Sequence, residues 1–175
     1  NSLEYTGEVA NGWLGTSFSP DHPEAHLSFI ESGALKNGRT LRDIDLCVSA
    51  RVEIGDDLDA MIDKRRAAVA FNMGGMGSAD TNFYNDAFKR AGYAEEASII
   101  QALWLAGKRD EAAKRVPDAM ITEFQLLGPK DQVKSRIQRY KEAGVTTLKL
   151  GLDGAGPLGR GRFELLEEIV DLVTE

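Results

Sequence analysis

The chain has 175 residues, which is enough for one domain with a hydrophobic core of its own. With 42% hydrophobic and 28% charged residues, it has the composition of a soluble globular protein, and no apolar run approaches the roughly 18 residues of a membrane span. The net charge of -7 argues against non-specific binding to nucleic acid or to an anionic membrane. A single cysteine, Cys47, and the absence of a signal-peptide pattern favour a cytoplasmic protein.

The first third of the chain alternates short strands with amphipathic helices. A short buried strand is predicted around Trp13 and Leu14, and a helix with proline in its first turn follows from Pro23 to Leu35. The clearest strand runs from Ile44 to Ile54, because its apolar residues recur with a period of two. Asp56 or Asp57 then caps the next helix.

The middle of the chain is less regular. The stretch from Asn72 to Asn82 is rich in Gly, Met and Ser, and its Gly-Met loop, Asn72 to Gly77, could be a flexible lid over an apolar cofactor edge. Helical patterns follow from Phe83 to Ala91 and from Glu95 to Val116, with Gly107 as a break. A further short helix is predicted from Asp118 to Glu123.

Regular alternation returns near the end of the chain. Pro129 begins a helix that Gly144 ends, and a β-branched, apolar strand is predicted from Thr146 to Leu152. A glycine loop from Gly154 to Gly161 leads into a last amphipathic helix. Its predicted buried face carries the apolar residues Phe163, Leu166, Ile169 and Val173.

This order of elements predicts parallel βα units in an α/β fold. Three strands make a small sheet, so the arrangement is best explained as the C-terminal part of a (β/α)8 (TIM) barrel. We expect residues 1–175 to form a single domain, with a helical insertion at about residues 72–124, before the last strand. We also expect the strand that starts at Ile44 and the strand that starts at Thr146 to be adjacent and parallel.

Four segments in a consistent order carry a resemblance to a known family. They are Tyr5 to Leu14 (YTGEVANGWL), the strand from Asp45 to Ile54 with the Gly-Asp-Asp that follows it, Leu126 to Val133, and Glu142 to Leu148. Together they span almost the whole chain. This set resembles the luciferase-like monooxygenase superfamily, in particular its deazaflavin-dependent branch of methylenetetrahydromethanopterin reductase-like proteins.

The resemblance implies an oxidoreductase that transfers a hydride between its cofactor and a small organic substrate. The implied cofactor is the deazaflavin coenzyme F-420 (F420), with FMN as the alternative. Family members are about twice as long, and their first half supplies most of the pocket. We therefore expect this chain alone to be inactive, and to pair with an N-terminal barrel half or with a second copy of itself. The substrate and the catalytic residues are not identified by the sequence.

The first candidate binding site is Gly15, Thr16 and Ser17, which follow the first strand at the end where barrels bind ligands. In the resembling glucose-6-phosphate dehydrogenases, the threonine that matches Thr16 contacts the substrate phosphate. Ser19 stands where those enzymes have a lysine, so a sugar phosphate is not implied. The alternative is a Ser/Thr turn that caps the following helix. Trp13 is either core packing or a border of the cofactor site.

The second candidate site is the loop that contains Gly154, Gly156 and Arg160. Its G-x-G-x-x-G spacing favours binding of a phosphate by backbone amides, and a barrel also binds phosphate after its last strand. The alternative function is therefore a non-catalytic phosphate- or nucleotide-binding α/β module. No metal site is expected, because His22 and His26 at the start of a helix lack a third ligand.

Overall fold

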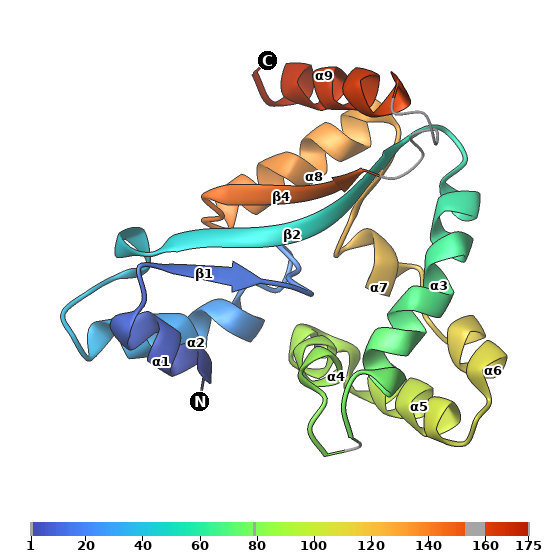
Figure 1. Ribbon diagram of the computed structural model, residues 1–175, viewed down its shortest axis with the longest axis horizontal. Helices are drawn as coiled ribbons and strands as arrows, with labels where there is room; N and C mark the ends of the chain where they lie inside the picture. Colours follow the sequence, from blue (N-terminus) through green and yellow to red (C-terminus); the bar gives the residue numbers. More distant parts are fainter. Residues whose placement is uncertain (1, 79, 153–159, 175) are drawn as a thin grey trace.

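The sheet is built around one long central strand (Figure 1). The computed structural model describes residues 2–78, 80–152 and 160–174. Within that part of the chain, β2 (Asp45–Ile54) pairs in parallel with each of the other strands: β1 (Gly12–Gly15), β3 (Leu126–Gly128) and β4 (Thr147–Leu152). The predicted adjacency of β2 and β4 is confirmed.

The register shows which edges of β2 these strands occupy. Cys47 and Val48 pair with β1 and also with β4, so those two strands lie on opposite edges of β2. β3 pairs with the last three residues of β2, Val52 to Ile54. The sequence prediction of three strands missed β3. Its three residues are all buried, so no alternation of apolar and polar side chains marks it as a strand.

The two faces of β2 differ in character. Leu46, Val48, Ala50 and Val52 are buried, because they pack with α2 (Glu24–Leu35) and α8 (Lys130–Glu142) in one hydrophobic cluster. Side chains alternate along a strand, so the intervening residues, including Arg51, lie on the opposite face. The sheet therefore has one helix-covered face and one face with polar residues.

Helix α1 (Ser2–Val9) crosses α2 at very close range. A Cβ atom built at Gly7 would lie 1.9 Å from the carbonyl oxygen of Ile30, and one built at Gly33 would lie 1.8 Å from that of Glu4. The two glycines therefore allow the two helix backbones to touch.

A second hydrophobic cluster lies among the helices between β2 and β3. It joins α3 (Leu58–Gly75), α5 (Ala94–Leu105), α6 (Arg109–Lys114) and α7 (Ala119–Thr122), with α4 (Phe83–Phe88) and the π-helical turn η2 (Lys89–Tyr93) beside them. Figure 1 shows these helices beyond the carboxyl end of β1. Asp57 caps α3 by accepting a hydrogen bond from the amide of Ala60, and Gly107 separates α5 from α6, as predicted.

The first four residues of the predicted Gly-Met loop, Asn72 to Gly75, are helical. Helix α3 continues through Gly75, so the hypothesis of a flexible lid is wrong for residues 72–75. The reason is tertiary packing: a Cβ atom at Gly74 would lie 2.2 Å from Cβ of Trp104, so the glycine gives Trp104 room to pack directly on the helix.

The last helix, α9 (Arg160–Thr174), buries one of the four residues of its predicted face. Ile169 is buried, and Leu165 and Leu172 pack beside it against the sheet cluster. The other three residues of the predicted face, Phe163, Leu166 and Val173, are exposed. The helix carries two neighbouring apolar stripes, and the sequence alone does not show which of them meets the sheet.

Candidate functional site

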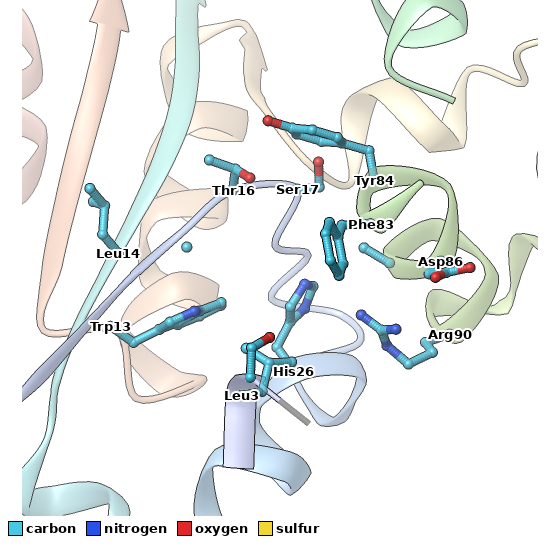
Figure 2. A pocket seen from close by; sticks show the side chains of 13 residues that line it. Leu3, Trp13, Leu14, Thr16, Ser17, His26, Phe83, Tyr84, Asp86 and Arg90 are labelled. Atoms are coloured by element: carbon cyan, nitrogen blue, oxygen red, sulfur yellow. The ribbon is translucent and has the colours of Figure 1, made fainter. Parts of the chain in front are cut away.

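A cavity of about 450 Å³ opens at the carboxyl end of β1 (Figure 2). It lies between β1 with its following loop, the start of α1, α2, and the α4–η2 segment of the helical insertion. Its volume is within the usual range for small-molecule sites. The lining residues are Ser2, Leu3, Trp13, Leu14, Gly15, Thr16, Ser17, His26, Phe83, Tyr84, Asp86, Ala87 and Arg90.

The wall formed by β1 depends on Gly15. A Cβ atom at this position would lie 2.3 Å from the Trp13 ring, so glycine lets the indole lie across the strand. The indole is 5.3 Å from the His26 ring and meets Phe18 edge-on at 6.1 Å, measured between ring centroids. Trp13 thus packs against the core and also lines the cavity, while its place at the border of a cofactor site stays a prediction.

The hydroxyl groups of Thr16 and Ser17 follow β1 at the cavity (Figure 2). Ser17 has a left-handed backbone conformation, with φ of 52°, and this bend carries the chain on to the buried Phe18. Ser19 is buried, and its Oγ accepts a hydrogen bond from the Asp21 amide at 3.2 Å. The Ser19 hydroxyl therefore stabilises the turn, and position 19 contributes no positive charge to the cavity.

His26 presents a neutral imidazole to the cavity. Burial, and then the nearby positive charge of Arg90, lower its pKa from 6.5 to about 4. Its Nδ1 is buried and has no hydrogen-bond partner among the described groups. Arg90 is held in place because its Nε donates to the Ala25 carbonyl at 2.8 Å and its guanidinium lies over the Phe29 ring. The uncharged His26 ring therefore lies beside the fixed guanidinium of Arg90.

The sequence analysis missed the residues that the helical insertion contributes. Phe83 and Tyr84 begin α4 and line the cavity opposite β1, and Phe83 is 77% exposed although it is aromatic. The side-chain amide of Asn82 donates to the carbonyls of Asn72 and Met73, and that of Asn85 donates to the carbonyls of Met73 and Ala97. The run Asn-Phe-Tyr-Asn, Asn82 to Asn85, indicates in the sequence that a helix starts there. It does not indicate the direction in which the two aromatic rings point.

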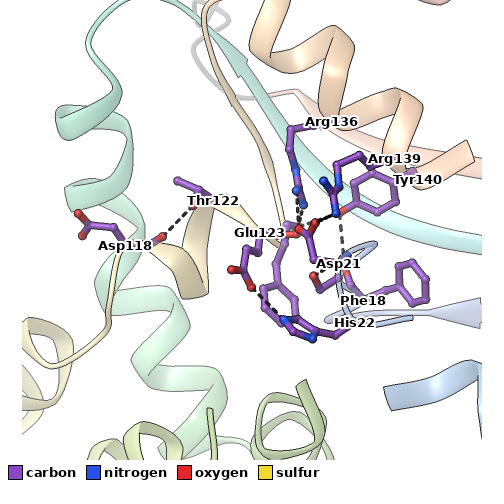
Figure 3. A network of polar contacts seen from close by, with 11 residues as sticks. Phe18, Asp21, His22, Asp118, Thr122, Glu123, Arg136, Arg139 and Tyr140 are labelled. Atoms are coloured by element: carbon purple, nitrogen blue, oxygen red, sulfur yellow. Dashed lines mark hydrogen bonds and ion pairs between the residues drawn. The ribbon is translucent and has the colours of Figure 1, made fainter. Parts of the chain in front are cut away.

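A polar network holds the loop that follows β1 (Figure 3). Arg136 of α8 donates to Asp21 at 2.5 Å and to the carbonyl of Glu123, and Arg139 also pairs with Asp21. The buried Tyr140 hydroxyl donates to the Phe124 carbonyl at 3.1 Å and lies 3.4 Å from that of Phe18. Burial raises the pKa of Tyr140 well above its ordinary value, so this hydroxyl stays protonated. The network therefore holds Phe18 and Asp21, which follow Thr16 and Ser17 in the same loop, in place.

The structure thus brings Trp13, Gly15, Thr16 and Ser17 together at one cavity, while their binding role stays a prediction. Gly154 and Gly156 lie outside the described residues. Arg160 is the first residue of α9. Among the described residues, no group of three or more His, Cys, Asp and Glu side chains is placed to hold a metal ion. The two ring nitrogens of His22 instead face Glu24 and Glu123, each at 3.6 Å.

The fold matches solved barrel enzymes. The coenzyme F420-dependent tetrahydromethanopterin reductase from Methanopyrus kandleri superposes with a TM-score of 0.63 and 32% sequence identity, over 89% of this chain and 43% of that one. An F420-dependent secondary alcohol dehydrogenase, in complex with an F420-acetone adduct, gives a TM-score of 0.66 at 15% identity, over 98% of this chain and 45% of that one. The chain is therefore part of a (β/α)8 barrel, as predicted.

The sequence matches the family described as luciferase-like monooxygenase over residues 1–147, and the chain belongs to this family. A Mycobacterium tuberculosis protein named as a coenzyme F420-dependent oxidoreductase is 32% identical over 149 residues, 84% of this chain and 43% of its own length. The 5,10-methylenetetrahydromethanopterin reductase of Methanopyrus kandleri is 31% identical over 166 residues, 94% of this chain and 44% of its own length. The chain spans less than half the length of these curated relatives. No described helix combines the length and hydropathy needed to cross a membrane.

Proposed function

We propose that the chain forms part of an oxidoreductase that uses coenzyme F420 and acts on a small organic substrate, with FMN as the alternative cofactor. The observation that carries the proposal is the cavity at the carboxyl end of β1, because the Trp13–Ser17 segment that walls it lies within the family match. Relatives named for F420 match most of this chain. We further propose that residues 1–175 form one domain, with an insertion at about residues 72–124.

The side chains at the cavity suit a flat, conjugated ring with polar edges. Trp13, Phe83 and Tyr84 offer aromatic surface, and Thr16 and Ser17 offer hydroxyl donors. When bound, a deazaflavin supplies the carbon centre that gives or takes a hydride.

The residues of this chain would orient the ring and keep water away from it. The buried, neutral His26 presents no charge to an apolar ring, and Arg90 lies beside it to balance a negative charge on a ligand. The amide contacts of Asn82 and Asn85 hold the aromatic wall of α4 in a fixed position, which reduces the ordering cost of binding. The site would be completed by the rest of the barrel, or by a second copy of the chain.

A binding titration tests this proposal. The complete barrel protein, meaning this chain together with the remaining part of the barrel, is titrated with F420 and with FMN and followed by fluorescence. We expect F420 to bind, the isolated chain to retain none, and Thr16→Val to weaken binding about tenfold through loss of one hydroxyl hydrogen bond. Thr174→Val, at the exposed end of α9, is the matched control and should bind normally. Tight binding of FMN instead would select the alternative cofactor, and binding of neither would overturn the proposal.

A further inference from the structure

The loop that joins β1 to α2 reaches the cavity at one end and a polar network at the other (Figures 2 and 3). Thr16 and Ser17 line the cavity, whereas Asp21, further along the same loop, is bound by α8. Neither Asp21 nor Arg136, its partner on α8, belongs to the described lining of the cavity. An effect of Asp21 on a ligand at the cavity must therefore pass through the loop backbone.

Two arginines of α8 hold the Asp21 carboxylate. Its Oδ2 accepts a hydrogen bond from Arg136 Nη1 at 2.5 Å, and its Oδ1 pairs with Arg139. The side chains of Asp21 and Arg136 are 18% and 14% exposed, so water and salt screen their attraction less than at the surface. Among the described residues, no second carboxylate pairs with either arginine. The negative charge of Asp21 is therefore the main electrostatic attachment of the loop to α8.

The attachment of Asp21 extends back along the loop toward Ser17. The Asp21 amide donates to Ser19 Oγ at 3.2 Å, and Ser19 is buried. Phe18, which directly follows Ser17, is also buried, and its carbonyl oxygen lies 3.4 Å from the Tyr140 hydroxyl of α8. The segment that follows Ser17 is thus tied both to itself and to α8.

Ser17 needs this support because of its backbone conformation. With φ of 52°, it is the one non-glycine residue in the left-handed region among the residues that the structure describes. This region costs an L-residue conformational free energy, so the conformation persists where surrounding contacts enforce it. The contacts that follow Ser17 in the loop are those anchored by Asp21. The bend at Ser17 sets the direction in which the Thr16 and Ser17 hydroxyls meet the cavity.

We infer that Asp21 is a positioning residue for ligand binding. Its ion pairs with Arg136 and Arg139 hold the bend at Ser17, and this bend presents the hydroxyls of the cavity wall to the ligand. The inference rests on the proposed function of the cavity and adds a residue that does not touch the ligand. Without the ion pairs, the loop samples conformations that do not bind. The apparent affinity then falls in proportion to the fraction of molecules that keep the binding conformation.

Hydrogen exchange of the complete barrel protein, without F420, tests whether Asp21 orders the bend. Asp21→Asn keeps the size of the side chain and removes its charge. We expect the amides of residues 17–22 to exchange about fivefold faster while those of β2 and α3 stay unchanged, because the loop opens locally. Arg139→Gln removes the more exposed of the two arginines and should show a smaller acceleration at the same amides. No acceleration at these amides, or an equal acceleration throughout the fold in both variants, would overturn the inference.

A titration with F420, or with FMN if the protein prefers it, then tests the link to binding. Asp21→Asn should weaken binding about fivefold, and Asp21→Glu, which keeps the charge, should retain most of the affinity. Asp118→Asn is the matched control: its carboxylate also pairs with an arginine, Arg66, at 2.5 Å, but lies outside the loop, so binding should be unchanged.

Unchanged binding in Asp21→Asn would contradict the inference. If the unchanged protein binds neither cofactor, the proposed function alone is contradicted, and the exchange measurement still decides whether Asp21 orders the bend.

Discussion

At the scale of single residues, the cavity beside β1 depends on two residues with unusual surroundings. Gly15 is required by the Trp13 indole, and His26 is a histidine that the fold keeps uncharged. Trp13 and Phe18 pack against the imidazole, so a proton on it would have to be accommodated in a largely apolar setting. The neutral state of His26 is therefore coupled to the packing of the cavity wall.

This coupling predicts a specific loss of stability in acid. The folded protein holds His26 neutral down to about pH 4, whereas the unfolded chain protonates it below about pH 6.5. The unfolded state binds more protons between these values, so the free energy of unfolding falls as the pH drops through that window, by about 3 kcal/mol in total. Urea unfolding of the complete barrel protein at a series of pH values measures how the free energy of unfolding depends on pH.

Replacing the imidazole isolates its contribution. His26→Phe keeps a ring of similar size, cannot be protonated, and should flatten the dependence between pH 6.5 and 4. His22→Gln is the control and should leave the dependence in place, since His22 is partly exposed between two glutamates. An equal acid dependence in His26→Phe and in the unchanged protein would show that His26 is not its source.

At the scale of elements, glycines determine how closely two helices pack. Gly7 of α1 and Gly33 of α2 each face the backbone of the partner helix, so a methyl group at either position has no space unless the helices separate. The sequence shows these glycines but does not show that they lie at a helix crossing, because the contacts join Gly7 to Ile30, 23 residues apart, and Gly33 to Glu4, 29 residues apart.

We expect Gly7→Ala and Gly33→Ala each to lower the free energy of unfolding by about 2 kcal/mol, although alanine favours an isolated helix more than glycine does. Chemical unfolding of the complete barrel protein gives the value. Ser28→Ala, on the exposed face of α2, is the control and should change stability by less than about 0.5 kcal/mol. A gain in stability in either glycine variant would show that the helices separate at little cost.

At the scale of the whole molecule, apolar side chains are exposed on the edge strand β1 and on the helix α9. Within the described chain, β1 and β4 pair with β2 alone, and Leu14 on β1 is 66% exposed. On α9, the exposed residues Phe163, Leu166, Val170 and Val173 follow the 3-4-3 spacing of a helix contact stripe. In a closed barrel each strand and each helix has a neighbour on both sides, so these surfaces match the parts that the rest of the barrel would cover.

We expect the isolated chain to associate with itself and thereby cover the edges of the Trp13 and Thr146 strands. Light scattering at micromolar concentration measures this, and Phe163→Ser with Val170→Ser should reduce the association. Leu105→Ser, at an exposed position of α5, is the matched control. A monomer that unfolds cooperatively would contradict the prediction, because it would show that the open edges carry no large cost.

The sequence by itself determined the elements that have a strong local signal. The alternation in β2, the Asp57 cap, the break at Gly107 and the helix that begins after Pro129 all depend on neighbouring residues, and all are present in the structure. The family match likewise follows from the sequence, because a set of four segments in a consistent order carries it without any knowledge of tertiary contacts.

Tertiary structure decided the rest, because those features depend on contacts between distant segments. It extended α3 through Gly75 under Trp104, formed β3 beside β2, and chose which stripe of α9 meets the sheet. It also placed Phe83 opposite Trp13 at the cavity beside β1. Periodicity reports that a face is apolar, whereas the identity of its partner is set by packing across the whole fold.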